Sequence, residues 1–185
     1  MTQYGFFFDQ SRCIGCHTCA VACKDWYDIP AGSVNWIRVS EILDGKFPNL
    51  KMSYLSIACN HCTNPPCIKS CPNSAIIKRE EDGIVLVNQD LCLGYEECGG
   101  KCLKSCPWKA PQFKNKNNAK MEKCNLCFTR LEKGQQPICV EACPMYALDV
   151  GPIEELKEKY DYNSEAEGFK TNDQINPSII FKTRK

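Results

Sequence analysis

The alternation of apolar and polar positions predicts few regular elements in this chain, and all of them are short. Apolar runs rich in strand-forming residues predict two strands, GFFFD at Gly5 to Asp9 and DGIVLVNQD at Asp82 to Asp90. The segments Thr18 to Asp25 and Ile68 to Ser70 are long enough only for brief helical turns. Because so little regular structure is predicted, we expect other cross-links to do much of the work of an apolar core.

The chain from Pro152 onward begins with an amphipathic segment, IEELKEKY, and becomes polar from Asp161 to Asn176. It closes with SIIFK, a short apolar strand that either folds back on its own domain or lies along a partner chain. Further upstream, the lysine-rich segment Asn115 to Lys123 is predicted to be a solvated hairpin. The alternative for that segment is a docking surface for an acidic partner.

Cysteine changes this picture most, because 16 of the 185 residues are cysteines. A disulfide framework would need an oxidising compartment, and the N-terminus MTQYGFFFDQSRC has neither a basic region nor an apolar run of signal-peptide length. Elsewhere no apolar run reaches the roughly eighteen residues of a membrane span. We therefore expect a protein that is soluble as made, has no direct membrane span and meets a membrane only through a partner.

The formal net charge is +1 when every cysteine is counted as neutral. Sixteen metal-bound thiolates would make the protein acidic even after the positive charge of the metal is counted. We therefore expect no nucleic-acid partner. The sequence also has no Gly-rich phosphate loop, no G-x-S-x-G and no recognisable pair of carboxylates, so no catalytic residue is predicted.

The cysteines fall into four quartets without remainder, and quartets two, three and four are each followed by a proline that suits the first turn of a helix. The quartets are Cys13, Cys16, Cys19 and Cys23 (C-x2-C-x2-C-x3-C); Cys59, Cys62, Cys67 and Cys71 (C-x2-C-x4-C-x3-C); Cys92, Cys98, Cys102 and Cys106 (C-x5-C-x3-C-x3-C); and Cys124, Cys127, Cys139 and Cys143 (C-x2-C-x11-C-x3-C).

This spacing favours iron-sulfur clusters over zinc and disulfides, which are the alternatives. A zinc site usually takes two C-x2-C knuckles from separate segments, since four ligands around one ion leave no room for a third nearby cysteine. In a [4Fe-4S] cube, three closely spaced thiolates each bind a different iron. In the run C-x2-C-x2-C-x3-C-P, the last cysteine binds the other cluster of a pair. We therefore predict four [4Fe-4S] clusters with the cysteines as iron ligands.

The distance along the chain predicts which quartets exchange their last cysteine. Only 20 residues separate Cys71 from Cys92, the compact spacing of one ferredoxin module, so quartets two and three pair and quartets one and four pair around them. The predicted ligand sets are Cys13, Cys16 and Cys19 with Cys143; Cys124, Cys127 and Cys139 with Cys23; Cys59, Cys62 and Cys67 with Cys106; and Cys92, Cys98 and Cys102 with Cys71.

The predicted fold class is α+β, with two bacterial-ferredoxin-like modules, one inserted in the other, and short strands and helices around four clusters. Residues 1–50 and 115–150 form the outer module, residues 51–114 the inserted module and residues 151–185 a C-terminal tail.

His17 and His61 lie inside cysteine loops whose quartets are already complete, so we expect them to be loop residues and not ligands. Trp108 is expected to pack over a cluster edge, with an electron relay as the alternative.

In order and spacing, the quartets resemble those of the four-cluster iron-sulfur subunit of the dimethyl sulfoxide reductase family of molybdenum and tungsten enzymes. The resemblance covers roughly Tyr4 to Val150. It is carried by FDQSRCIGCHTCAVACKDW, CNHCTNPPCIKSCP and KCNLCFTRLEKGQQPICVEACPMYALDVG. The resemblance implies an electron-transfer subunit that transforms no substrate itself and conducts electrons, through clusters in a line, to or from a large molybdenum or tungsten bis-pterin catalytic subunit.

Many members of that family also dock on a membrane-anchor subunit, and others work as soluble pairs. A subunit without its own signal is either cytoplasmic or exported folded with a partner that bears a twin-arginine signal.

The third run, CLGYEECGGKCLKSCP, departs from the family pattern by three extra residues in the first gap and one in the second. Gly94, Gly99 and Gly100 allow that loop to bulge, so a [4Fe-4S] cluster is expected there, with a three-iron or empty site as the alternative.

Two other functions fit the same cysteines. A free-standing polyferredoxin would shuttle electrons between several enzymes, although a diffusing carrier has no need of the SIIFK strand. A zinc-bound scaffold would only mediate interactions, and it would be colourless where four cubanes are brown.

Overall fold

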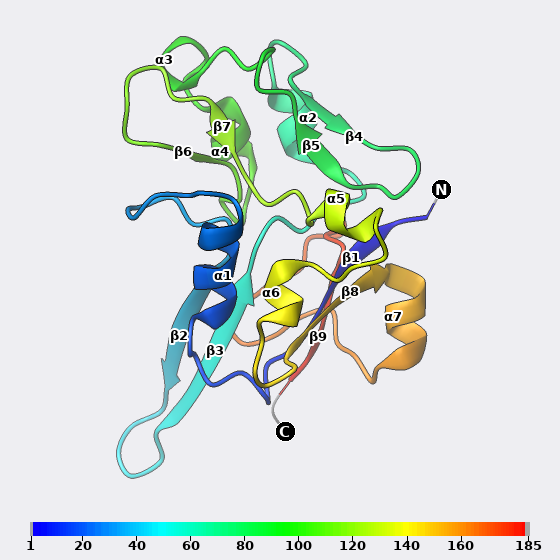
Figure 1. Ribbon diagram of the computed structural model, residues 1–185. Helices are drawn as coiled ribbons and strands as arrows, with labels where there is room; N and C mark the ends of the chain where they lie inside the picture. The colour runs from blue at the N-terminus through cyan, green and yellow to red at the C-terminus, as the bar shows by residue number, and fades with distance from the viewer. Residues whose placement is uncertain (1, 184–185) are drawn as a thin grey trace.

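The computed structural model describes residues 2–183, and its central element is the first strand. β1 (Tyr4–Asp9) pairs antiparallel with β8 (Leu148–Pro152) and parallel with β9 (Ile179–Lys182), so the sheet order is β8-β1-β9 (Figure 1). Phe6 lies opposite Val150 on one side and Ile179 on the other. The first and last strands of the chain are therefore neighbours in one sheet.

The other strands form antiparallel hairpins. They are β2 (Arg38–Asp44) with β3 (Lys51–Ile57), β4 (Ile76–Lys78) with β5 (Val85–Val87), and β6 (Gln112–Phe113) with β7 (Met121–Glu122). Hairpin β2–β3 has paired residues from Arg38↔Ile57 to Asp44↔Lys51, and its tip extends away from the body at the lower left of Figure 1. The apolar pattern did not predict this hairpin, although Asp44 and Gly45 between two alternating runs are a turn signal.

The helices are brief, and most of them follow a cysteine loop. They are α1 (Thr18–Trp26), α2 (Pro66–Ser70), α3 (Tyr95–Cys98), α4 (Lys101–Ser105), α5 (Phe128–Leu131), α6 (Ile138–Glu141) and α7 (Ile153–Lys159). α1 packs against α6, and α2 packs against α4, while α7 lies beside β1 and β8. Within the described residues, no helix has the length and apolar character needed to cross a membrane.

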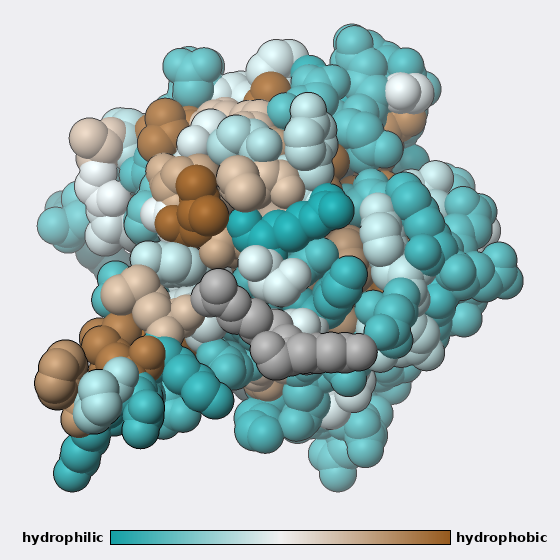
Figure 2. All heavy atoms as spheres, turned by 90° about the horizontal axis from the view of Figure 1, so that it is seen from below, coloured by the Kyte–Doolittle hydropathy of each residue, from teal (hydrophilic) through white to brown (hydrophobic). Residues whose placement is uncertain are grey.

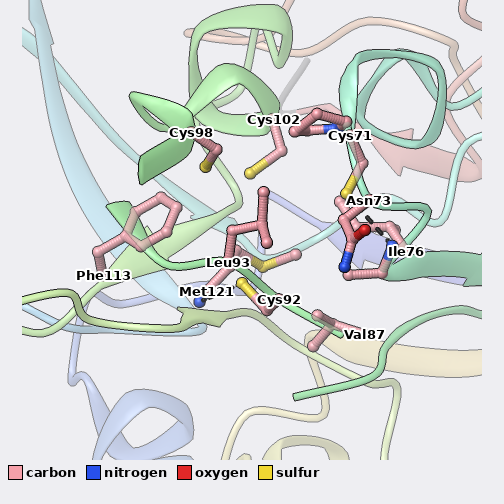
Figure 3. Close-up of a pocket in the computed structure, with 12 residues that line it drawn as sticks. Cys71, Asn73, Ile76, Val87, Cys92, Leu93, Cys98, Cys102, Phe113 and Met121 are labelled. Carbon is pink, nitrogen blue, oxygen red and sulfur yellow. Dashed lines mark hydrogen bonds between the residues drawn. The ribbon is translucent and has the colours of Figure 1, made fainter. Parts of the chain in front are cut away.

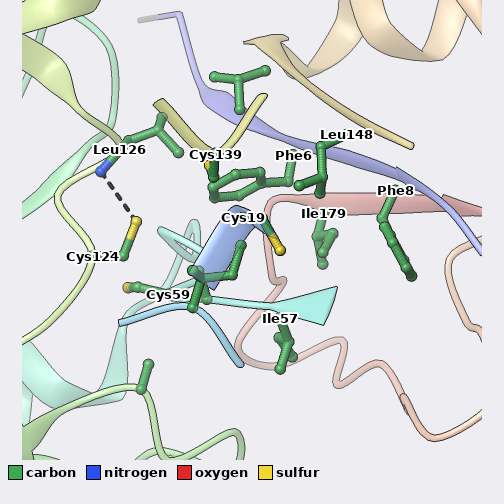
Figure 4. Packing of buried hydrophobic residues seen from close by; sticks show 14 of the residues in the cluster. Phe6, Phe8, Cys19, Ile57, Cys59, Cys124, Leu126, Cys139, Leu148 and Ile179 are labelled. Carbon is green, nitrogen blue, oxygen red and sulfur yellow. Dashed lines mark hydrogen bonds between the residues drawn. The ribbon is translucent and has the colours of Figure 1, made fainter. Parts of the chain in front are cut away.

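The core is a layer of aromatic and aliphatic side chains between the β8-β1-β9 sheet and the cysteine loops. Figure 4 shows Phe6, Phe8 and Ile179 in the same interior as Cys19 and Cys139. Phe181 meets Phe8 edge to face with ring centroids 6.5 Å apart. On the far side of the same sheet, Phe7 packs in a small cluster with Leu156 and Ile180.

The tail contributes to this core, which corrects part of the sequence-based picture. β9 folds back on its own chain, so the structure has the first of the two alternatives for SIIFK. The segment Asp161 to Asn176 is not simply a polar linker, because its Phe169 is buried and contacts the rings of Phe181 and Trp108. Trp108 stacks on Phe169 at 5.4 Å between ring centroids, so its packing partner is the tail.

Of the predicted elements, GFFFD corresponds to β1, and Thr18 to Asp25 corresponds to α1. The strand predicted over Asp82 to Asp90 is shorter, because only Val85–Val87 pair in a ladder. The polar segment from Asn115 does form a hairpin turn, between β6 and β7. Its last residue, however, is buried and not solvated: Lys123 is 2% exposed.

Candidate iron-sulfur sites

The backbone turns in the same way inside each cysteine loop. The second residue after the first cysteine of every quartet has a positive φ: Gly15 (68°), His61 (43°), Gly94 (95°) and Leu126 (58°). A residue with positive φ turns the chain sharply, so successive thiols of a loop face one centre. Two of these positions carry side chains, which costs about 1 kcal/mol or more at each and has to be offset by the rest of the site.

The exits of quartets two, three and four are also alike, as each follows the pattern Cys-Pro-x-x-Ala. The residue before the alanine is again left-handed (Ser74, Lys109 and Tyr146). The alanine N–H then donates back to the cysteine Sγ: Ala75 to Cys71 at 3.3 Å, Ala110 to Cys106 at 3.4 Å and Ala147 to Cys143 at 3.4 Å. Such N–H donors favour a thiolate over a thiol. Cys23 ends quartet one without this turn, because it lies inside α1.

Two cavities of about 340 Å³ of empty volume each are lined by four cysteines. Cys71, Cys92, Cys98 and Cys102 line one of them together with apolar side chains such as Phe113 and Met121, and Figure 3 shows the four sulfurs converging on it. The other cavity is lined by Cys13, Cys16, Cys19 and Cys143. Both linings combine thiols with apolar groups and include no carboxylate.

The remaining eight thiols form two buried groups, which their mutual effects on pKa reveal. Burial raises the pKa of Cys62, and the neighbouring thiols of Cys59, Cys106 and Cys67 raise it further. Burial also raises the pKa of Cys139 well above its usual range.

The thiols next to Cys139 add to that shift, and they are Cys124, Cys127, Cys23 and Cys19. Burial likewise raises the pKa of Cys23 to about 12, with Cys127 and Cys19 as its thiol neighbours.

We name the four groups in their spatial order. Site 1 is Cys13, Cys16, Cys19 and Cys143; site 2 is Cys23, Cys124, Cys127 and Cys139; site 3 is Cys59, Cys62, Cys67 and Cys106; and site 4 is Cys71, Cys92, Cys98 and Cys102.

Burial is the main cause of the raised pKa of Cys139, Cys23, Cys124 and Cys67, and a thiol of the neighbouring site raises each pKa further: Cys19 acts on Cys139 and Cys23, Cys59 on Cys124, and Cys102 on Cys67. The sites therefore follow one another as 1, 2, 3 and 4.

The chemistry of these donor sets fits a polynuclear metal centre. The sixteen cysteines are all free of disulfide bonds. In residues 2–183 no three His, Cys, Asp or Glu side chains converge as they would around a single metal ion. Four buried thiols cannot all ionise next to one another without added positive charge, which iron supplies when a cluster binds. That these sixteen thiols are iron ligands, in these sets, stays a prediction.

The two histidines have different surroundings. His17 is exposed at the start of α1, with φ 59°. His61 is fully buried, and its Nδ1 accepts a hydrogen bond from the N–H of Val85 at 3.0 Å, so its proton lies on Nε2. Burial lowers the pKa of His61, and the charges of Lys123 and Lys78 lower it further. The imidazole is therefore neutral, in the interior beside site 3.

Sequence reasoning missed Lys123, the last residue before Cys124. Its Nζ donates to the carbonyl of Cys124 at 2.9 Å and to the carbonyl of Val85. This residue lies in a lysine-rich segment, where a charged residue is normally solvated, and nothing in the local pattern distinguishes it from Lys120. Its position directly before a ligand cysteine is the only signal available.

Comparison with known proteins agrees with the cysteine geometry. A family model described as a 4Fe-4S dicluster domain matches residues 50–153, and one described as a 4Fe-4S binding domain matches residues 4–25. The B subunit of anaerobic dimethyl sulfoxide reductase from Haemophilus influenzae is 40% identical over 194 residues, which cover 100% of this chain and 91% of that protein. The protein is a member of the dimethyl sulfoxide reductase B-subunit family. In Escherichia coli strain K12, the subunit with the same name is 46% identical over 167 residues, 86% of this chain and 78% of the relative.

Protein NrfC of Escherichia coli strain K12 is a more distant relative, 35% identical over 154 residues, which cover 83% of this chain and 67% of NrfC. Membership of the B-subunit family, together with the two matching domain models, makes the protein an iron-sulfur electron-transfer subunit that binds multiple [4Fe-4S] clusters. The fold is the expected mixture of α and β with small sheets around ferredoxin-type cluster domains.

Proposed function

We propose that this subunit relays electrons one at a time between a molybdenum or tungsten bis-pterin catalytic subunit and a second redox partner, through four [4Fe-4S] clusters in a line. The observation that carries the proposal is the linear order of four four-cysteine sites inside one small protein. When bound, the clusters supply the one-electron redox centres. The chain fixes their spacing, keeps water from sites 2 and 3 and donates N–H groups to the sulfurs.

The proposed arrangement is a module within a module. Residues 1–50 and 115–150 would hold sites 1 and 2, and residues 51–114 would hold sites 3 and 4, with residues 151–185 closing the sheet of the outer module. The packing of α1 against α6 and of α2 against α4 supports this division, because each contact joins two quartets that are proposed to exchange a ligand. The pairing of β1 with β8 supports it in the same way for the outer module.

The catalytic subunit is proposed to dock beside site 1. Cys16 is the exposed cysteine among the sixteen, and the exposed apolar side chains of Ile14 and Met145 line the same cavity. Figure 2 shows apolar groups gathered toward the left of this face, which is the side of hairpin β2–β3 in Figure 1. The tip of that hairpin adds Phe47, which is 95% exposed. An accessible end of the relay with an apolar border suits a permanent protein partner.

The proposal also includes a membrane-anchor subunit, which would bind at the other end of the relay, next to site 4. Leu91 and Ile77 are exposed near that end, at 45% and 51%. They form a smaller apolar surface than the one at site 1.

Iron, acid-labile sulfide and zinc per chain, measured on anaerobically purified protein, test this function. About sixteen irons and about sixteen sulfides are expected; about fifteen irons would indicate a three-iron cluster at site 4, and about twelve an empty site. Purification through a tag on this subunit should also recover a large subunit with stoichiometric molybdenum or tungsten. Zinc without sulfide, or a protein that purifies alone with all clusters present, would contradict the proposal in its cofactor or in its partner.

A further inference from the structure

Lys123 is a buried cation between the two inner sites. The side chain is 2% exposed, and its Nζ donates to the carbonyl of Cys124, a site 2 cysteine, at 2.9 Å. A second hydrogen bond goes to the carbonyl of Val85 in β5. Lys123 also acts on Cys67 of site 3: burial and nearby thiols raise the pKa of Cys67, and the charge of Lys123 lowers it. The charge therefore reaches both inner sites at once.

No carboxylate balances this charge. Among residues 2–183, no Asp or Glu oxygen lies within 4.0 Å of the Lys123 Nζ, although eight other basic side chains of the same part of the chain form such ion pairs. An isolated buried ammonium is costly, and two carbonyl oxygens offset that cost only in part. The groups that can offset the rest are the neighbouring cysteine thiolates with the metal they hold.

His61 and Lys78 are the other titratable side chains near Val85. Burial lowers the pKa of His61, and the charges of Lys123 and Lys78 lower it further, while the Nζ of Lys78 donates to the carbonyls of Cys62 and Thr63. Val85 connects His61 and Lys123: its N–H donates to His61 and its carbonyl accepts from Lys123. This bridge fixes both side chains on the short β5 strand and holds the ammonium in place.

We propose that Lys123 is the fixed counter-charge of sites 2 and 3, and that it makes the centres bound there easier to reduce than a neutral side chain would. The inference rests on the proposed function, since it concerns the clusters of those sites. Each reduction adds one negative charge to a site. A positive charge in a dry interior favours that state far more than an exposed lysine does, because little water screens it.

Lys120 provides a matched comparison. Its Nζ also donates to the carbonyl of a proposed ligand, Cys92 of site 4, but its side chain is exposed. The two lysines therefore have the same kind of acceptor and differ in burial. If the buried charge matters, replacing Lys123 has a large effect on two centres and replacing Lys120 has a small effect on one.

The test is a potentiometric titration, followed by electron paramagnetic resonance, of the full-length, cluster-loaded protein with Lys123→Gln and Lys123→Met. Glutamine can still donate to a carbonyl but has no charge. We expect two of the four midpoint potentials to fall in both variants. The expected fall is at least about 59 mV, which for a one-electron couple is a tenfold change in the ratio of reduced to oxidised centre. The other two potentials should stay unchanged, and Lys120→Met should shift at most one, by less.

Unchanged potentials in a variant with full iron and sulfide content would overturn the inference and leave the proposed function intact, whereas zinc without sulfide would remove both. Equal shifts of all four potentials would also overturn it, because a local counter-charge acts on its neighbours. If both neutral variants lose iron, Lys123→Arg separates the effect of charge from that of shape. Recovery of the iron in this variant supports the inference that the charge is required. Continued loss of iron shows that the shape of lysine, not its charge, is needed, and overturns the inference.

Discussion

At the scale of single residues, the sites depend on backbone conformations that few side chains tolerate. The loop of site 1 shows why, because a Cβ on Gly15 would lie 2.3 Å from the ring of Tyr54 in β3 while φ is +68°. The glycine thus meets two demands, a left-handed turn and close contact with the hairpin. Leu126 meets only the first, and its side chain is accommodated in the core.

We expect Gly15→Ala to empty site 1. Left-handed alanine costs about 1 kcal/mol, and the clash with Tyr54 adds to it, so iron should fall from about sixteen toward about twelve per chain. Iron analysis of anaerobically purified protein measures this. Gly134→Ala is the control. Gly134 has a similar φ of +70°, but a Cβ added there would meet no atom within 4 Å outside its chain neighbours.

Tyr54→Ala together with Gly15→Ala separates the two causes. The double variant should regain part of the iron, since the clash is gone and only the backbone cost remains. Full iron in Gly15→Ala alone would show that the loop adapts and that the close contact has no role.

The intervals between cysteines predicted the type of cofactor from the sequence. Residues whose role depends on burial were not predicted. The cysteine intervals alone indicate cluster chemistry, because they reflect how far apart the irons are. Lys123 and Phe169 gave no such signal, since each lies in a polar stretch and contacts residues distant in the chain, Val85 and Trp108 respectively. No local pattern reports such contacts.

At the scale of elements, the tail strand is part of the core. Phe181 in β9 is fully buried and contacts the rings of Phe8 and Phe169. The apolar run SIIFK predicted the strand correctly. Its partner, β1, was not predictable from the sequence, because a strand of this length carries no information on which edge it joins.

Phe181→Ala is expected to cost about 3–5 kcal/mol of stability through the cavity it leaves. In practice the variant should unfold at clearly lower temperature and lose its visible absorption earlier on heating. Phe47→Ala, which removes a ring that is 95% exposed, is the matched control and should behave like the unchanged protein. Equal melting curves for all three proteins would mean that β9 does not hold the fold together.

Hairpin β2–β3 illustrates the opposite failure of prediction. It is the longest strand pair of the described residues, and the alternation on both sides of Asp44 and Gly45 was present in the sequence. The hairpin lies between two quartets and contains no cysteine, so the cysteine spacing gives no signal for it.

At the scale of the whole molecule, the two ends of the relay have different surfaces, which makes the docking proposal testable. Phe47→Ser combined with Leu50→Ser changes two exposed apolar residues of the hairpin tip. We expect at least about a tenfold weaker association with the catalytic subunit, measured by co-purification and by titration of the separate subunits, because the loss of apolar contacts exceeds about 1.4 kcal/mol.

Ile77→Ser combined with Leu91→Ser changes exposed residues at the opposite end and is the control for this experiment. It should leave the association unchanged, and both double variants should keep full iron. Weaker association from the control pair, with none from the hairpin pair, would place the catalytic subunit at site 4.

Removal of iron should affect the two parts of the molecule unequally. The apolar cluster around sites 3 and 4 includes Cys67, Cys92 and Cys102 among its few buried members, whereas the sheet of β1, β8 and β9 has an aromatic core of its own. After anaerobic chelation, hydrogen exchange should therefore speed up most in α2, α4 and β4–β5 and least in β1. Uniform exchange across the protein would mean that the clusters support every part of the fold equally.

The pairing of β1 with β8 and β9 also limits when the central sheet can form. β1 is translated well before its neighbours β8 and β9, so it has no sheet partner until both have followed it along the chain. Site 1 waits in the same way for Cys143, while the proposed module of residues 51–114 is contiguous and can complete its own thiol sets earlier. We therefore expect the proposed outer module to be completed after the inserted one, and a nascent chain that lacks β8 and β9 leaves Phe6, Phe7 and Phe8 uncovered.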